Sequence, residues 1–249
     1  MQMLLVDLGN SRLKWAMHNG DALQASSVVT HRETELSALL ANVWATLTRP
    51  QRVVIASVAE QDRMNQLAGW VQQQWSLNAE FIVSPDHGHG LINSYHEPAR
   101  LGCDRWAAMV AAYHLAHAAV CVVDCGSAVT IDVVDDTGQH QGGLILPGVQ
   151  AMHAALTRHT TLAPIDFAPS SSTPLLGKST QEGMRSGITR AISSLVEQTL
   201  LDLTRSTDMR ISCYLTGGDA ALIAPLLPIQ YELDPDLVLK GLAIIARAT

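Results

Sequence analysis

Residues 3–17 read MLLVDLGNSRLKWAM, and residues 119–134 read AVCVVDCGSAVTIDVV. Each stretch runs from an apolar segment to an aspartate, turns at once through glycine and small polar residues, and continues into a second apolar segment. Short apolar runs bounded by glycine and small polar residues are typical of β-strands joined by a tight turn. Asp7 and Asp124 are separated by close to half of the 249 residues. The repeat therefore predicts two similar halves, residues 1–117 and 118–249.

The two turns have the composition of phosphate-binding turns. A strand that ends in aspartate places a carboxylate at the edge of a sheet, where it can hold a metal ion or its water shell, and the glycine permits a tight turn with outward-pointing amides. Asn10 and Ser11 add side-chain donors to the first turn. Ser127 and Thr130 do so in the second. One Asp-Gly turn would be an ordinary hairpin, but two in equivalent strand contexts, with LTGGD at 215–219, favour a nucleotide gripped from opposite sides.

Composition narrows the class of protein. With 47% hydrophobic residues the chain can bury a sizeable core. It has no apolar run of about 18 residues and no signal-like start, so we expect a cytoplasmic protein without a membrane span. The net charge is −7, and the absence of a basic stripe argues against a nucleic-acid partner. The four cysteines form no CxxC pair and are interpreted as reduced core residues.

Apolar runs alternate with amphipathic stretches in the manner of an α/β protein. In the first half we expect strands at Met3–Val6, Leu13–Met17, Arg52–Ser57 and Glu80–Val83, and helices at Glu33–Thr46, Glu60–Trp75 and Arg105–His117. In the second half we expect strands at Ala119–Val123, Val129–Val134, Gly143–Leu146 and Ile211–Leu215, and helices at Thr180–Arg205, Ala220–Leu227 and Asp236–Arg247. Residues 163–177, rich in proline and serine, are predicted to form a loop that acts as a lid or a binding edge.

Six motifs follow one another along the chain: DLGNSRLK, NSYHEPARLGCDRWAAM, DCGSAVTIDVV, GGLILPG, GKSTQEG and LTGGD. In this order they resemble the type III pantothenate kinases, members of the superfamily that includes acetate kinase, sugar kinases, heat-shock chaperones and actin. GCDRW after NSY is the most specific element, whereas the paired turns alone would indicate only the superfamily. The resemblance covers nearly the whole chain. It implies two actin-like, ribonuclease H-like α/β halves with a nucleotide cleft between them.

The resemblance also implies an activity, the ATP-dependent phosphorylation of the primary hydroxyl of pantothenate, which opens coenzyme A synthesis. It implies magnesium and a monovalent cation, potassium or ammonium, as cofactors, and a homodimer whose pantothenate pocket lies close to the subunit interface. It assigns ATP to Asp7, Leu8, Gly9, Asn10, Ser11, Arg12, Leu13, Lys14, Ser127, Gly217 and Gly218. It assigns pantothenate to Tyr95, Gly102, Cys103, Asp104, Arg105 and Thr180, with Asp104 as proton acceptor, Asp7 near magnesium and Asp124 at the monovalent cation.

Each of these residues also has a plain structural explanation. Asp104 can be an acid that interacts with a helix N-terminus, Tyr95 a loop aromatic, and Thr180 a helix cap. Arg105 can pair with a surface acid. The ordered set of motifs, and not any one residue, favours the functional assignments over these explanations. Under those assignments, Tyr95, Asp104 and Arg105 could converge on one small acid that bears a hydroxyl.

Two other functions remain open at this point. One is a kinase for another small hydroxylated or carboxylated metabolite. The other is a non-catalytic regulatory or accessory relative that keeps the nucleotide fold. The presence of Asp7, Asp104 and Asp124 together weighs against the regulator, because a protein freed from chemistry need not keep all three acids.

Overall fold

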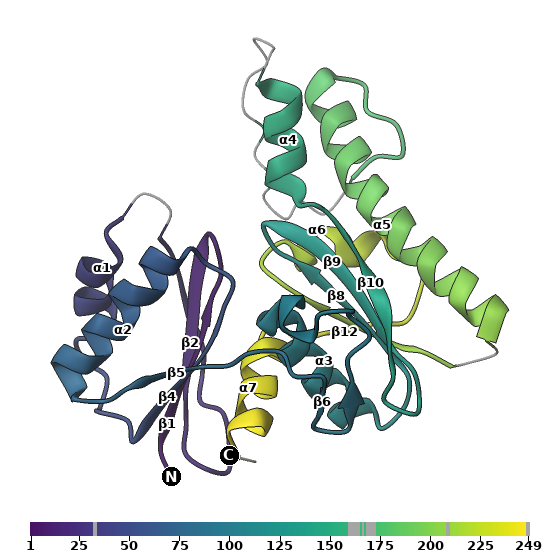
Figure 1. Cartoon of the computed structure of the whole chain (residues 1–249). Coiled ribbons are helices and arrows are strands. Elements are labelled where there is room, and N and C mark those ends of the chain that lie inside the picture. Colours follow the sequence, from purple (N-terminus) through teal and green to yellow (C-terminus); the bar gives the residue numbers. More distant parts are fainter. Residues whose placement is uncertain (32–33, 159–164, 166, 168–172, 208–209, 248–249) are drawn as a thin grey trace. The chain divides into compact units, whose positions relative to one another are not determined.

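Two five-stranded mixed sheets form the framework of the protein, with strand orders β3-β2-β1-β4-β5 and β10-β9-β8-β11-β12 (Figure 1). The structure is a computed structural model of the whole chain, and it describes all residues except 32–33, 159–164, 166, 168–172, 208–209 and 248–249. One compact unit holds Met1–His114 with the C-terminal segment from Asp236 onward, and the other holds Leu115–Pro235. The expected pair of similar α/β halves is confirmed.

The first unit is built on the predicted hairpin. β1 and β2 are antiparallel, with Asp7 opposite Lys14, while β4 runs parallel to β1 and β5 parallel to β4. A small two-stranded sheet, β6-β7, precedes α3 in the chain. The bounds in this unit are β1 Met3–Leu8, β2 Arg12–His18, β3 Ser27–Thr30, α1 Leu36–Val43, β4 Arg52–Ser57, α2 Gln61–Trp75, β5 Ala79–Phe81, β6 His87–Gly88, β7 Leu91–Ile92, the 3-10 turn η1 Pro98–Arg100, α3 Cys103–Ala116 and α7 Leu237–Arg247.

The second unit repeats this strand arrangement. β8 pairs with β9 as β1 does with β2, β10 takes the place of β3, and β11 and β12 take the places of β4 and β5. Even the burial along the first two strands is the same, position by position. The bounds are β8 Val120–Cys125, β9 Ala128–Val134, β10 His140–Pro147, α4 Val149–Thr157, α5 Thr180–Thr207, β11 Ser212–Thr216, α6 Ala220–Ile223, the 3-10 turn η2 Ala224–Leu226 and β12 Glu232–Leu233.

Successive side chains of a strand point to opposite faces of its sheet, and the central strands β1, β4 and β8 are buried on both faces. In the first sheet, Leu4, Val6 and Ile55 pack with residues of α1 and α2. Tryptophans strengthen this core, because the ring of Trp44 stacks on Trp75 with centroids 5.7 Å apart. In the second sheet, the equivalent face packs against α4, α5 and α6. No helix in the described part of the chain is long and apolar enough to cross a membrane.

Most predicted elements are present, and the differences have local causes. α3 begins at Cys103 rather than Arg105, so Asp104 lies inside the first turn. The α-helix that starts at Ala220 ends at Ile223 and continues as a 3-10 turn that contains Pro225, as expected where proline removes a backbone donor. The first residue of the predicted helix Glu33–Thr46 and most of the predicted loop at 163–177 lie outside the described residues.

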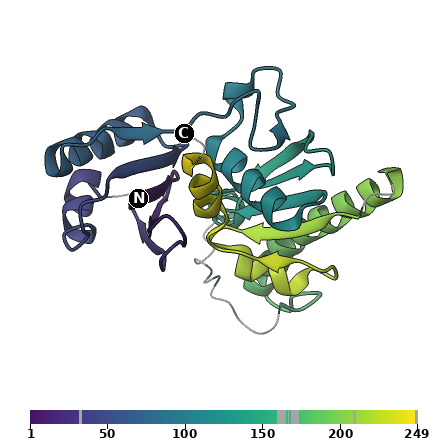
Figure 2. The same cartoon turned by 90° about the horizontal axis from the view of Figure 1, so that it is seen from below.

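The C-terminal helix belongs to the first unit, whereas the expected division at residue 117 grouped it with the second half. α7, which is the yellow helix near the C label in Figure 2, packs on β1, β2 and β4. Arg52 of β4 donates to the Ala246 carbonyl at 2.9 Å, and Arg247 donates to the Gly20 carbonyl at 2.8 Å. α7 also meets α3, because Gly241 lies so close to the backbone of Ala107 that a side chain at position 241 would collide with it.

This close approach predicts the effect of a single methyl group. Gly241→Ala should lower the free energy of unfolding by roughly 1–3 kcal/mol, since the added Cβ meets the carbonyl of Ala107 rather than a flexible side chain. Gly69→Ala in α2 is the matched control, because a Cβ added at that position would have nothing within 4 Å. It should be neutral or stabilising by up to about 1 kcal/mol. Urea denaturation of both variants tests this, and equal midpoints would contradict it.

Candidate active site

The two Asp-Gly turns close by the same hydrogen bond with different loop lengths. In the first, the Gly9 N–H donates to the Arg12 carbonyl at 3.0 Å, leaving two residues at the tip. In the second, the Gly126 N–H donates to the Ala128 carbonyl at 3.0 Å, leaving only Ser127. Asp7 and Asp124 occupy the same position in their strands and are both half-buried. Each turn therefore presents one carboxylate beside a short polar loop.

Glycines hold the second turn in place. The Gly148 N–H donates to the Ser127 carbonyl at 3.1 Å, and a side chain at 148 would collide with the Gly126 carbonyl. Gly217, at the end of β11, has a φ of +89°, which favours glycine. A side chain there would collide with Oδ1 of Asp124. The predicted residues Asp124, Ser127 and Gly217 are thus neighbours in the second unit.

The first turn is held from β4. The Ser57 hydroxyl and the Val58 N–H both donate to the Leu8 carbonyl at 3.3 Å. Lys14, expected at the phosphates, forms an ion pair of 2.7 Å with Asp236. Burial acts to raise the pKa of Asp236, but hydrogen bonds from Lys14 and Ser26 outweigh it and hold that pKa below its usual value. In this structure Lys14 links β2, just after the first Asp-Gly turn, to the start of α7.

The GCDR segment begins α3 and is tied to the same strand end. The Ser57 N–H donates to the sulfur of Cys103 at 3.1 Å, and the Cys103 thiol donates to the Ser57 carbonyl at 3.2 Å. Burial, with a smaller effect of the Asp104 charge, raises the pKa of Cys103 to about 11, so it stays a thiol at neutral pH. Gly102 leaves room for Asp104, whose Oδ1 would be 2.6 Å from a Cβ at that position. That oxygen accepts a hydrogen bond of 2.8 Å from the backbone N–H of Arg105.

Arg105 and Tyr95 contact each other. A guanidinium N–H of Arg105 donates to the Tyr95 hydroxyl at 2.8 Å, and the guanidinium carbon lies 5.6 Å from the centre of the ring. Arg105 is only 8% exposed, which excludes a role as an ordinary surface ion pair. Asn93 fixes the loop that carries Tyr95: its amide donates to the carbonyls of Pro85 and Pro98, and its oxygen accepts the Tyr95 N–H.

The predicted site residues fall into two groups. The first unit brings together the Asp7–Lys14 segment, Tyr95 and the Gly102–Arg105 segment, all joined through the end of β4. The second unit brings together Asp124, Ser127 and the Gly217–Gly218 turn. Thr180 is exposed at the start of α5 and follows Ser179, whose hydroxyl accepts the Glu182 N–H as a helix cap.

Sequence reasoning missed the residues that support the site. Asn93 lies within the NSY motif, yet its three hydrogen bonds to backbone groups give no signal in the sequence. Ser57 was predicted only as the end of a strand. Gly148 ends the GGLILPG motif and stands directly before α4. A glycine between a strand and a helix is the signal in the sequence that could have indicated its role.

Comparison with known proteins identifies the family. A family model described as type III pantothenate kinase matches residues 3–201. A type III pantothenate kinase from Nitrosococcus oceani is 35% identical over 257 residues, which cover 99% of this chain and 94% of that protein. The chain belongs to the type III pantothenate kinase family. As such it is an ATP-dependent kinase that phosphorylates pantothenate, the first step of coenzyme A biosynthesis.

Solved structures extend the likeness to the fold. A protein from Campylobacter jejuni described as a conserved putative Baf family transcriptional activator has a TM-score of 0.61 and 22% identity, with 98% of each chain covered. The activator of 2-hydroxyisocaproyl-CoA dehydratase from Clostridium difficile, solved with bound ADPNP, has a TM-score of 0.57 and 14% identity, covering 99% of this chain and 94% of that one. At these identities the comparison shows a shared fold only.

Proposed function

We propose that Asp104 is the general base of pantothenate phosphorylation, and that Arg105 and Tyr95 bind the pantothenate beside it. The observation that carries the proposal is the position of Asp104 in the first turn of α3, next to a buried arginine and tied through Ser57 to the strand that bears the phosphate turn. The acid, the cationic receptor and one phosphate turn thereby belong to a single compact unit.

The chemistry requires a carboxylate that can accept the proton of the substrate hydroxyl. Phosphoryl transfer needs the alcohol oxygen in line with the γ-phosphate, and a carboxylate that accepts the hydroxyl proton also orients that oxygen. Asp7 and Asp124 each adjoin a phosphate turn, where a cation would occupy their oxygens. One oxygen of Asp104 accepts a hydrogen bond from the backbone N–H of Arg105. A carboxylate has further acceptor positions for a substrate hydroxyl.

Arg105 suits the carboxylate end of pantothenate. A guanidinium binds a carboxylate in bidentate fashion, and the pairing is stronger where water is excluded. The contact with the Tyr95 hydroxyl fixes one edge of the guanidinium and orients the rest. Tyr95 in turn is held by Asn93. A small acid with a hydroxyl at its other end is the substrate class that this pair, with Asp104, would accept.

The cofactors follow from the two turns. Among the described residues, no group of three or more His, Cys, Asp or Glu side chains could hold a metal ion. Magnesium is commonly bound by one or two carboxylates together with water and substrate phosphates, so Asp7 fits it. Bound there, it would neutralise charge on the phosphates of ATP. We place the monovalent cation, potassium or ammonium, at Asp124, whose Oδ1 lies close to Gly217. We place the nucleotide against Ser127, Gly217 and Gly218.

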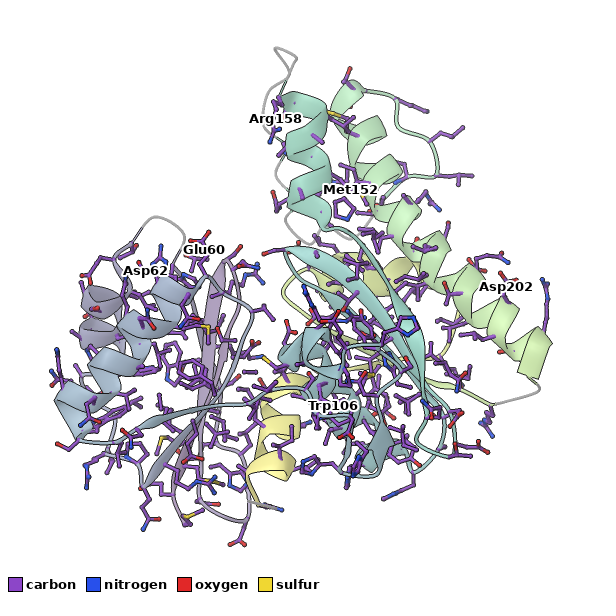
Figure 3. All side chains as sticks on the ribbon, in the orientation of Figure 1. Glu60, Asp62, Trp106, Met152, Arg158 and Asp202 are labelled. Carbon is purple, nitrogen blue, oxygen red and sulfur yellow. The ribbon has the colours of Figure 1, made fainter. Side chains whose placement is uncertain are left out.

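We also propose a homodimer that associates through α4, α5 and β10. An apolar cavity of about 590 Å³ lies between α4 and α5, lined by Met152, Leu156, Met184 and Ile188 among others. Figure 3 labels Met152 on α4, in the space beside α5. Ile145 on the adjoining edge strand β10 is 63% exposed. Apolar surface of this kind marks a contact site, and a second copy would cover it.

A cytoplasmic location is part of the same proposal. Cys103, Cys121, Cys125 and Cys213 are free and buried, which agrees with a reducing compartment.

Replacement of the proposed base should stop catalysis and spare nucleotide binding. Asp104→Asn keeps the size of the side chain and loses the proton acceptor, so kcat should fall by roughly 10²-fold or more with little change in affinity for ATP. Asp62→Asn is the matched control, because Asp62 is also an acid in the first turn of a helix but is exposed on α2 (Figure 3). Its kcat should equal that of the wild type. Turnover by folded Asp104→Asn within a few fold of the wild type would place the base elsewhere.

The monovalent cation gives a second test. ADP release should require pantothenate together with potassium or ammonium, because a cation at Asp124 would offset the crowding of phosphate charge. In buffers with sodium alone the rate should fall, and Asp124→Asn should remove the difference between the two buffers. Equal wild-type rates in both buffers would contradict the cation site.

The quaternary structure is tested by light scattering. At micromolar concentration the particle should have about twice the mass of the 26.8 kDa chain. Met152→Asp, which places a charge in the apolar cavity between α4 and α5, should shift the mass toward the monomer. A wild-type mass equal to one chain would rule out the proposed dimer.

A further inference from the structure

His31 is a buried residue that contacts the first phosphate turn twice. It follows β3 directly and is 2% exposed. Its backbone N–H donates to the Ser11 carbonyl at 3.1 Å, and its ring Nε2 lies 2.9 Å from the Gly9 carbonyl oxygen. A carbonyl oxygen only accepts hydrogen bonds, so Nε2 must carry the proton in this contact. One residue therefore binds two carbonyls of the same turn.

Comparison with the second unit shows which of the two His31 contacts occurs at both turns and which occurs only at the first. In the second unit, Gly148 follows β10 as His31 follows β3, and its N–H donates to the Ser127 carbonyl at 3.1 Å. The backbone contact is thus shared by both turns. At Gly148 the missing side chain lets the backbone approach the Gly126 carbonyl closely. At His31 the imidazole ring occupies this place and donates to the equivalent carbonyl of Gly9.

This difference matters because the first turn is one residue longer. Its two-residue tip, Asn10 and Ser11, has more conformational freedom than the single residue at the tip of the second turn. Among the described residues, Gly9 receives a ring hydrogen bond from His31 alone, and Nδ1 of that ring is buried with no described hydrogen-bond partner. The polar contact that the ring makes is therefore directed to the turn.

A fixed Gly9 carbonyl determines where the next amide points. The peptide unit is planar and trans, so its carbonyl and its N–H point in opposite directions. With the Gly9 carbonyl turned to His31, the N–H of Asn10, an exposed residue at the tip of the turn, points away from His31. The Ser11 carbonyl is held in the same way by the His31 backbone, which turns the Arg12 N–H away.

We propose that His31 is a positioning residue for the nucleotide, which holds the first turn with its backbone amides directed toward the ATP phosphates. The inference rests on the proposed phosphate-binding role of this turn. It predicts an effect on nucleotide affinity that does not extend to pantothenate, because Tyr95 and Arg105 are held by other residues.

Three variants separate the ring hydrogen bond from the volume of the ring. His31→Phe keeps most of the volume and loses the donor, and the Kd for magnesium-ADP, measured by calorimetry, should rise roughly fivefold to tenfold. His31→Gln offers an amide N–H and should restore most of the affinity. His153→Phe, a buried histidine of α4 that stacks edge-on with Phe167, is the control and should bind magnesium-ADP like the wild type. The KM for pantothenate should change less than twofold in all three.

The outcomes distinguish this inference from the proposed function. If the wild type does not bind magnesium-ADP, the proposed nucleotide site fails. If the wild type binds it and folded His31→Phe binds equally well, the role of His31 is refuted while the nucleotide site stands. If His31→Phe does not fold, a measurement on the wild-type protein alone tests the inference. The ¹⁵N spectrum of wild-type histidines must show His31 protonated at Nε2, and a ring protonated at Nδ1 alone would overturn the inference.

Discussion

The end of β4 is the constraint on which the site depends. Ser57 exchanges hydrogen bonds with Cys103 on one side and donates to Leu8 on the other. Leu8 follows Asp7 and begins the first Asp-Gly turn, and Cys103 begins α3 and precedes Asp104. One residue therefore sets the separation between the turn and the acid. The raised pKa of Cys103 keeps its sulfur protonated and able to donate to Ser57, so the junction persists at neutral pH.

The duplicated architecture supplies two turns that differ where different chemistry is needed. Both units use the same strand order and place an aspartate at the same position. In the second unit, glycine at 148 and 217 packs backbone directly against the turn and its acid. In the first, the side chains of His31 and Ser57 add hydrogen bonds to carbonyls of the turn, the loop before α3 adds Tyr95, and the first turn of α3 adds Arg105. Under the proposed function, the first unit would bind the small acid, and the more compact turn of the second would bind the nucleotide and the cation.

Local pattern predicted the elements whose information is local. Both hairpins could be predicted from apolar runs bounded by glycine and small polar residues, and most of the helices from their amphipathic spacing. The edge strands β3 and β12 were missed because their residues are mostly exposed and show no alternation of burial. The last helix of the chain was predicted, but the sheet on which it packs was not. An apolar helix face does not identify the surface that it covers. For the site, the expected proximity of Tyr95 and Arg105 agrees with their contact, whereas His31 and Gly9 are 22 residues apart and nothing in the sequence connects them.

The most direct test of the account is a single reaction with the wild-type protein. ATP, magnesium, a potassium salt and pantothenate are combined, and the products are identified by mass spectrometry, with other small hydroxy acids in parallel tubes. The account predicts ADP in equal amount to a phosphorylated pantothenate, and no comparable turnover with the other acids. ADP release that does not depend on pantothenate, or equal phosphorylation of an unrelated hydroxy acid, would contradict it.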